Sequence, residues 1–168
     1  KINFLIISNF IFLNLLLIKS LMLLKTLTKL FVRDLNKLKV EIELYNNEKN
    51  LWVLDKTILN SAGNLCLHLV GNLNHYIGSV LGKTDYMRQR DLEFSLKDIP
   101  RKELIKMVDD TIIMVEKTLK KVSNEELDKD YPLIVFKETM TTEYFLVHLA
   151  THLAYHLGQI NYHRRLLD

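Results

Sequence analysis

Histidine is the residue type in this sequence whose chemistry and spacing stand out. Its six copies occur in two parts of the chain, at positions 68 and 75 and between positions 148 and 163. An imidazole binds divalent metals through either ring nitrogen, and it titrates near neutral pH, so it also serves as an acid or a base. The clustering of the histidines is therefore the main indication of function in this chain.

Helical geometry would place these histidines on two polar stripes. When each residue turns a helix by about 100°, polar residues within each group share an arc of less than a quarter turn. The later stripe consists of His148, His152, His156, Gln159 and His163. The earlier stripe consists of Asn64, His68, Asn72 and His75.

The two stripes together predict a divalent-metal site. The helix that carries the later stripe is apolar nearly all round and is expected to be buried, where an unpaired polar group is costly. A metal ion satisfies several imidazoles at once, and His152 and His156, one helical turn apart, place two of them on one side of it. His68, on the facing helix, supplies the third ligand. A lone helical histidine usually packs in a core or lies on the surface, but this combination reverses that expectation.

The other polar residues of the stripes are expected to support this site. His148 is a candidate base or a group that orients the ligands, because three histidines on one straight helix span about 12 Å, too far for one ion. Asn72, His75 and Gln159 are expected to orient ligands or substrate. We expect His75 and His163 at the outside of the site or at the protein surface.

Composition favours a single all-α domain. The chain has 168 residues, of which 48% are hydrophobic, enough for one domain with a real core, and it has only five glycines and two prolines. The net charge is +3, and no basic stripe is interleaved with aromatic residues, so no nucleic-acid partner is expected. The single cysteine, Cys66, cannot form an internal disulfide, fits a reducing compartment and is expected to pack.

Four helices with apolar stripes must position the histidines, and together they predict a four-helix bundle. Pro100 suits the first turn of the third helix, and Thr141 or Thr142 caps the fourth. Ser123 and Glu126 form a capping-box pattern. The expected helices are 22–45, 61–81 with Gly82 as C-cap, 100–122 and 141–168, with a polar connection at 84–91 and extended chain at 131–136.

Residues 1–21 differ in composition from the rest of the chain. They are apolar without a clear helical face, whereas the chain from Met22 onward alternates apolar and charged residues. Three interpretations compete: a start misassigned upstream of Met22, a secretory signal and a membrane anchor. We expect the domain to span residues 22–168, in the cytoplasm if Met22 is the true start, with membrane association only if residues 1–21 are an anchor.

The histidine segments resemble those of a known superfamily. The string HLATHLAYHLGQINYHRRLL, centred on His152, His156 and Gln159, and the earlier string LCLHLVGNLNHYIG are similar to the DinB-like superfamily, also called YfiT-like metalloenzymes. The resemblance covers about residues 22–168. It implies a four-helix bundle, often a homodimer, in which three histidines hold a divalent zinc, nickel or iron ion. Carried over to this chain, those histidines are His68, His152 and His156.

The resemblance also implies metal-dependent chemistry on a small molecule. Characterised members of the superfamily include thiol-dependent S-transferases and a thiol-dependent isomerase, and none of this implies DNA binding. Three neutral imidazoles leave the charge of a divalent ion uncompensated, which lowers the pKa of bound water toward about 7 and favours a thiolate. We therefore expect an enzyme that acts on a small-molecule substrate, either as a hydrolase or as an S-transferase whose partner is a low-molecular-weight thiol. No glutamate follows His152, which argues against a zincin-type peptidase.

Two alternatives stay open at this point. A non-catalytic, metal-binding dimer would close its structural site with a fourth ligand. A bundle without any metal would require His68 to lie far from the helix that carries His152 and His156.

Overall fold

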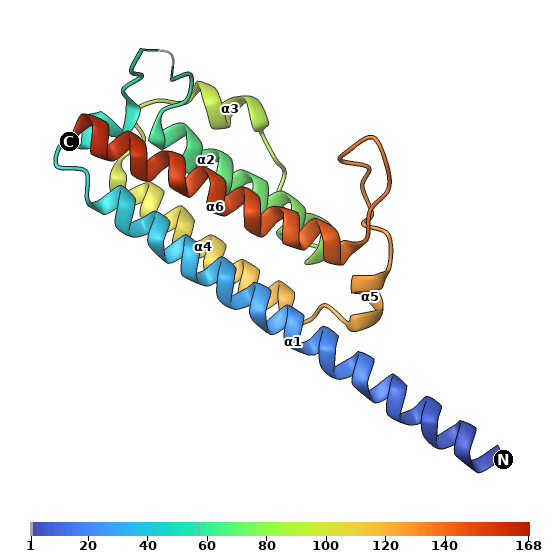
Figure 1. Cartoon of the computed structure of the whole chain (residues 1–168). Helices are drawn as coiled ribbons and strands as arrows, with labels where there is room; N and C mark the ends of the chain where they lie inside the picture. The colour runs from blue at the N-terminus through green and yellow to red at the C-terminus, as the bar shows by residue number, and fades with distance from the viewer. Residues whose placement is uncertain (1, 57) are drawn as a thin grey trace.

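The computed structural model describes the backbone of residues 2–56 and 58–168 and the side chains of residues 22–56 and 58–168. Within these ranges the chain is helical, without a β-strand, and Asp130 and Thr141 form an isolated antiparallel bridge. The all-α prediction is confirmed. The elements are α1 (Ile2–Glu43), the 3₁₀ helix η1 (Glu48–Trp52), α2 (Ala62–Leu73), the π-helix η2 (Asn74–Leu81), α3 (Arg90–Ser95), α4 (Arg101–Leu119), α5 (Asn124–Asp128) and α6 (Thr142–Leu167) (Figure 1).

The four long helical segments lie alongside one another. Both α1 and α2 pack against α4 and α6, and Figure 1 shows their axes running in roughly the same direction. The predicted apolar stripe of the first helix is confirmed, because Phe31, Leu35, Leu38 and Ile42 are fully buried. The side chains of residues 1–21 lie outside the described residues. The expectation that residues 1–21 are separate from the folded domain therefore stays a prediction.

The second helix follows the predicted range and changes type part-way. Ser61 caps α2 by accepting a hydrogen bond from the Asn64 amide, and helical structure continues through η2 to Leu81. Gly82 follows with φ −81°, so it does not use the left-handed conformation expected of a C-cap glycine. It instead gives room to a neighbour, since a Cβ at this position would lie 2.5 Å from Thr118 Oγ1.

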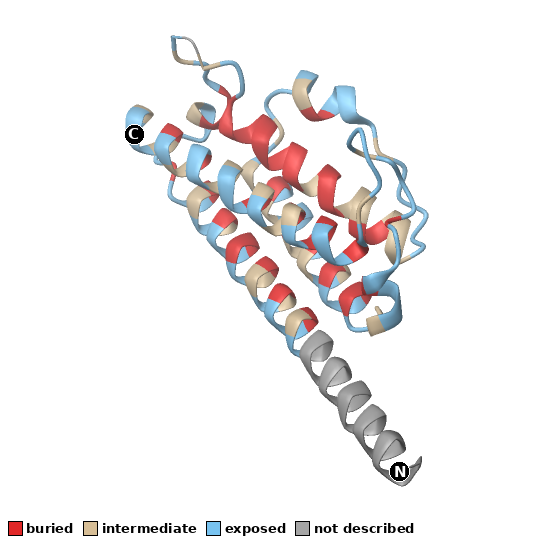
Figure 2. Cartoon of the chain, turned by 45° about the vertical axis from the view of Figure 1, so that its right-hand side comes forward, coloured by how far each residue is buried: buried red, intermediate tan, exposed pale blue. Residues whose placement is uncertain are grey.

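The most enclosed helix is α2, and the prediction that the last helix is buried on all sides is wrong. Every residue of α2 except Val70 is buried, because α4 and α6 pack against it and α3 covers it. Figure 2 shows this contrast between α2 and its neighbours. Along α6, one side stays exposed to solvent and carries Tyr144, Val147, Tyr155, Tyr162 and Leu166.

The connections between the long helices agree with the sequence in part. The capping box of Ser123 and Glu126 is confirmed at the start of α5, and Thr141 caps α6. Pro100 is the N-cap of α4, which ends at Leu119, before the predicted residue 122. The segment after Gly82 was predicted to be only a polar connection, but it leads into α3, which packs on α2.

None of the helices in the described part of the chain has the length and apolar character needed to cross a membrane.

Candidate metal centre

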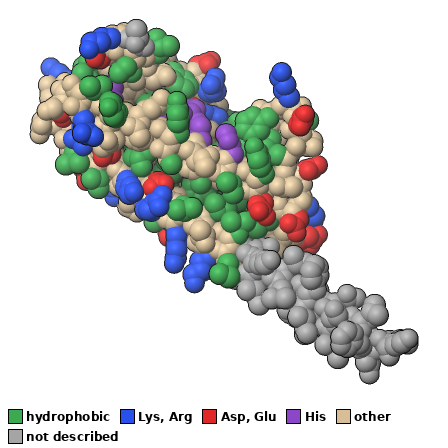
Figure 3. All heavy atoms as spheres, in the orientation of Figure 1, with side chains coloured by type: hydrophobic (Ala, Val, Ile, Leu, Met, Phe, Trp, Pro, Cys, Tyr) green, Lys and Arg blue, Asp and Glu red, His purple; other side chains and the backbone are tan. Residues whose placement is uncertain are grey.

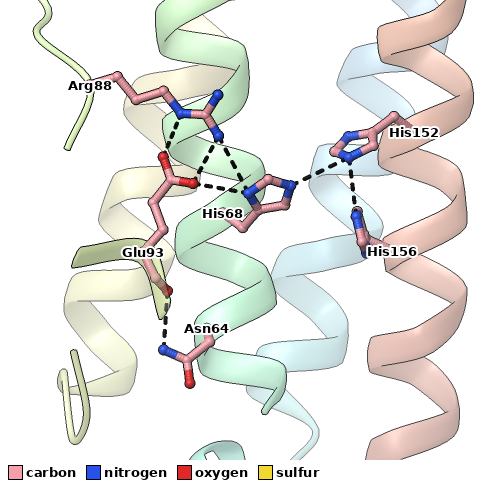
Figure 4. A network of polar contacts seen from close by, with 6 residues as sticks. All are labelled: Asn64, His68, Arg88, Glu93, His152 and His156. Atoms are coloured by element: carbon pink, nitrogen blue, oxygen red, sulfur yellow. Dashed lines mark hydrogen bonds and ion pairs between the residues drawn. The ribbon is translucent and has the colours of Figure 1, made fainter. Parts of the chain in front are cut away.

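Three histidines from two facing helices come together at one place. His68 comes from α2, and His152 and His156 come from successive turns of α6. One ring nitrogen of each lies within 4.8 Å of the other two. His152 Nε2 lies 3.3 Å from His68 Nε2 and 3.1 Å from His156 Nε2 (Figure 4). The structure therefore brings together the three residues that the sequence predicts as metal ligands.

The cluster is buried on one side and open on the other. His68 is 7% exposed, whereas His152 and His156 are half-buried on α6. In Figure 3, histidine side chains appear at the surface beside hydrophobic side chains, on the face that Figure 1 presents to the viewer. A small molecule can therefore approach the three imidazoles from solvent.

A buried carboxylate fixes the orientation of His68. His68 Nδ1 lies 2.9 Å from Glu93 Oε2, and the guanidinium of Arg88 donates to both oxygens of the same carboxylate, at 2.7 Å and 2.8 Å. Burial raises the pKa of Glu93, but the hydrogen bonds from Arg88 and His68 outweigh this effect and leave the pKa below its ordinary value. Glu93 is therefore ionised, so His68 carries its proton on Nδ1 and presents the lone pair of Nε2 to the cluster.

Two residues of α2 hold Glu93 in place. Asn64 Nδ2 donates to the carbonyl oxygens of Glu93, at 3.0 Å, and Leu96, at 2.9 Å, which ties α3 to α2. Gly71 provides the space for the carboxylate, since a Cβ there would lie 2.8 Å from Glu93 Cδ. The stripe of α2 that carries His68 thus also positions the group behind it.

His156 is oriented in the same manner from within α6. Its Nδ1 lies 2.6 Å from Gln159 Oε1, an acceptor that assigns the proton to Nδ1 and leaves the lone pair on Nε2. His152 lacks such support, because its Nδ1 is buried without a hydrogen-bond partner among the described residues. Burial and the neighbouring imidazoles of His156 and His68 lower the pKa of His152 to about 4.

The donor set fits a divalent cation. His68 and His156 each direct an Nε2 lone pair at the cluster, and a single N–H on His152 Nε2 can satisfy only one of them. A cation between the three nitrogens would satisfy all of them, and three imidazoles are an established ligand set for zinc and related metals. The arrangement could therefore hold a metal ion, whose identity the three nitrogens do not specify.

Comparison with known proteins places the chain in a family. Residues 20–168 match the family described as "Protein of unknown function (DUF1572)". The chain belongs to this DUF1572 family. No curated protein matches it.

A solved structure resembles this DUF1572 protein in fold. It is described as "Crystal structure of the conserved protein of locus from Enterococcus faecalis" and is 17% identical in sequence. The match covers 85% of this chain and 95% of that chain, with a TM-score of 0.66. At this identity the similarity extends to the fold alone.

Two further polar residues of the DUF1572 protein lie on the same stripes as the three histidines. The ring centroid of His148 is 6.0 Å from that of His152, and its imidazole packs against Phe136 and Phe145. Burial lowers the pKa of His148. Asn72, one turn after His68 on α2, is 7% exposed, and its Oδ1 accepts no hydrogen bond from the part of the chain that the structure describes. Both side chains therefore have unused hydrogen-bonding capacity.

The structure separates the remaining histidines from the cluster. His163 was expected on the outside of the site or at the surface, and this is wrong, since it is 3% exposed. Its Nδ1 lies 2.6 Å from Tyr45 Oη and its Nε2 lies 2.9 Å from the Val53 carbonyl. His75 is half-buried and packs its ring on Tyr76 rather than on the three histidines. His163 is thus a fully hydrogen-bonded core residue.

Sequence reasoning missed Glu93 and Arg88, and it placed Cys66 correctly. Cys66 is buried, and burial raises its pKa to about 12, so it has the character of a packing residue. Arg88 belongs to the segment 84–91 that was predicted to be a polar connection, and Glu93 follows that segment in α3. A general rule could have pointed there, because metal-binding histidines usually donate their second N–H to a carboxylate or a carbonyl.

Proposed function

We propose that this DUF1572 protein is a divalent-metal-dependent enzyme of the DinB-like, YfiT-like kind. It would act on a small molecule as a hydrolase or a thiol-dependent S-transferase. The observation that carries the proposal is the convergence of three Nε2 atoms, two of them with lone pairs fixed from behind. The side-by-side packing of α1, α2, α4 and α6 agrees with a four-helix bundle of that superfamily.

His68, His152 and His156 would hold the metal, which would be zinc, nickel or iron. When bound, such an ion supplies Lewis acidity, because neutral imidazoles leave its double charge uncompensated. Glu93 keeps His68 aimed at the cluster, and Gln159 does the same for His156. Such supporting partners typically change metal affinity by about 10–100-fold when they are removed.

His148 is the residue best placed to move a proton. Within the described residues its ring nitrogens form no hydrogen bond, and its ring lies next to His152. Its lowered pKa keeps it neutral near pH 7, so it can accept the proton of an attacking water or thiol. Asn72, whose Oδ1 is buried without a partner among the described residues, would orient a ligand or the substrate.

The openness of the cluster supports an enzyme over a structural metal site. A structural zinc site is usually closed by four protein ligands, whereas a catalytic one keeps a position for substrate. Three ligand side chains gather at this place in the described chain, and two of them are accessible from solvent. A homodimer, which the resemblance implies, stays a prediction that light scattering in solution would measure.

The proposal is tested by assaying the full chain with two kinds of substrate. p-Nitrophenyl acetate reports hydrolysis, and monobromobimane with or without bacillithiol or glutathione reports S-transfer. We expect turnover in one of the two assays. A chelator should remove this turnover, and one divalent ion should restore it. His148→Ala should lower the turnover at least tenfold while the metal content stays unchanged. Loaded protein that accelerates neither reaction would favour the structural site.

A further inference from the structure

A cavity of about 640 Å³ lies beside the candidate metal centre and has no part in the chemistry proposed above. It is bounded by residues 58–60, by the start of α2 and by the C-terminal half of α6. Its lining includes Leu59, Leu65, Tyr155, Gly158, Tyr162 and Leu166. The volume falls in the range of small-molecule sites, about 300–1,000 Å³.

The cavity reaches the metal centre through Gln159. This residue lines the cavity, and its Oε1 is also the partner of His156 Nδ1 at 2.6 Å. Its Nε2 donates to Tyr155 Oη, another lining residue, at 3.4 Å. A molecule in the cavity would therefore contact the side chains that stand directly behind one of the three histidines.

The described lining favours an uncharged ligand. Among the described residues it contains no lysine, arginine, aspartate or glutamate, so a charged group there would find no opposite charge to pair with. Its polar groups are the phenols of Tyr155 and Tyr162 and the amides of Asn60 and Gln159. His163 also lines it, but both ring nitrogens already have partners in Tyr45 and Val53. Such a surface suits an aromatic or branched alkyl group.

We propose that this cavity binds the uncharged, apolar part of the substrate on which the metal centre acts. The inference rests on the proposed function, and it adds the substrate class: a small molecule with an uncharged aromatic or alkyl group that lies on the Gln159 side of the three histidines. Gly158 leaves the wall of the cavity open, since a Cβ there would meet no atom within 4 Å. A larger side chain at this position would therefore start in open space, on a residue that lines the cavity, and we expect it to reduce the cavity.

The test uses N-phenyl-1-naphthylamine, an uncharged aromatic molecule that fluoresces when it enters an apolar site. It is titrated into the full-length wild type, Gly158→Leu and the matched control Gly158→Ala. We expect saturable binding to the wild type and the control, and at least tenfold weaker binding to Gly158→Leu. Equal affinity in all three proteins would overturn the proposal, as would weaker binding to the control by the same factor.

A second variant and a second readout keep the outcomes separate. Tyr162→Glu adds a charge to the wall at an exposed position, so it should also weaken binding of the probe. This variant takes the place of Gly158→Leu in the test if Gly158→Leu fails to fold. Metal content is measured in each protein. Probe binding without any bound metal would contradict the proposed function, whereas normal metal content with no saturable probe binding would contradict this inference alone.

Discussion

The two histidines that are oriented from behind, His68 and His156, differ from His152 in how they are held. Glu93 and Gln159 fix the first two, while the Nδ1 of His152 is buried without a partner among the described residues. Metal affinity should therefore depend on groups outside the three ligands, and most strongly on the charged Glu93.

Replacing Glu93 with glutamine should weaken metal binding by about 10–100-fold. The amide keeps the shape of the side chain but removes the charge that holds the proton on His68 Nδ1, and it leaves Arg88 without its ion pair. Competition titration with a chromophoric chelator measures the change. Glu103→Gln, at an exposed position of α4, is the matched control, and equal affinities in the two variants would count against a role for Glu93.

The lowered pKa of His152 predicts how the stability of the metal-free protein depends on pH. Its pKa is lowered from 6.5 to about 4, so between these pH values the unfolded chain binds a proton that the folded chain does not. The free energy of unfolding should therefore fall as the pH is lowered from 6.5 to about 4. Denaturant titrations should show a steeper fall in the wild type than in His152→Gln, and parallel curves would contradict the assignment.

For single residues, the sequence predicts the role of those whose partners are close in the chain and misses the role of those whose partners are distant in it. His152 and His156 follow from one helical turn of spacing, and His68 follows from its place on a polar stripe. The burial of His163 depends on Tyr45 and Val53, more than a hundred residues away. No periodicity within its own helix could show that contact, because the stripe looks the same whether the partner is a metal or a tyrosine.

The placement of α3 against α2 is the structural feature on which the orientation of His68 depends. Asn64 binds two carbonyl oxygens of the α3 segment, and Gly71 leaves room for the Glu93 carboxylate. Glycine within a helix is otherwise unfavourable by about 0.5–1 kcal/mol relative to alanine. Gly71 is therefore explained by the close approach of α3.

Gly71→Ala and Gly158→Ala should have opposite effects on stability. The first substitution forces the Glu93 side chain away from α2, so it should lower both metal affinity and the free energy of unfolding. The second meets open space in the exposed side of α6 and should raise the free energy of unfolding by about 0.5–1 kcal/mol. Urea titrations measure both changes, and a stabilised Gly71→Ala variant would show that α3 is not held as described.

The long helices are predictable from sequence because their apolar spacing is regular over several turns. The buried positions of α1 and the limits of α2 with η2 follow the expected pattern. The short α3 has too few residues to show a period. The expectation that the last helix is buried because it is apolar nearly all round was wrong, since apolar residues such as Tyr155 and Tyr162 lie on its solvent side.

In the whole molecule, the candidate centre joins α2 to α6, two helices that are far apart in the sequence. An ion held by His68 on one helix and His152 and His156 on the other would bind the folded chain and not the unfolded one. Free ion at 100 times its Kd would then stabilise the fold by about 2.7 kcal/mol. For a domain of this size the Tm should rise by roughly 5–10 °C.

This stabilisation should be lost when one helix no longer supplies its ligand. His68→Ala should abolish the metal-dependent rise in Tm, while His75→Ala, a histidine two turns further along the same helical segment, should retain it. Scanning calorimetry with and without a divalent ion distinguishes the two variants. A rise of the same size in both would place the ion elsewhere on the protein.

The most direct test of the account is the metal content of the purified full-length chain, measured by elemental analysis. The account predicts about one divalent ion per chain in the wild type and in His75→Ala. His152→Ala and His156→Ala should each contain less than about a tenth of that amount, with unchanged helix content. Equal metal content in the wild type and in these two variants would contradict the site formed by His68, His152 and His156.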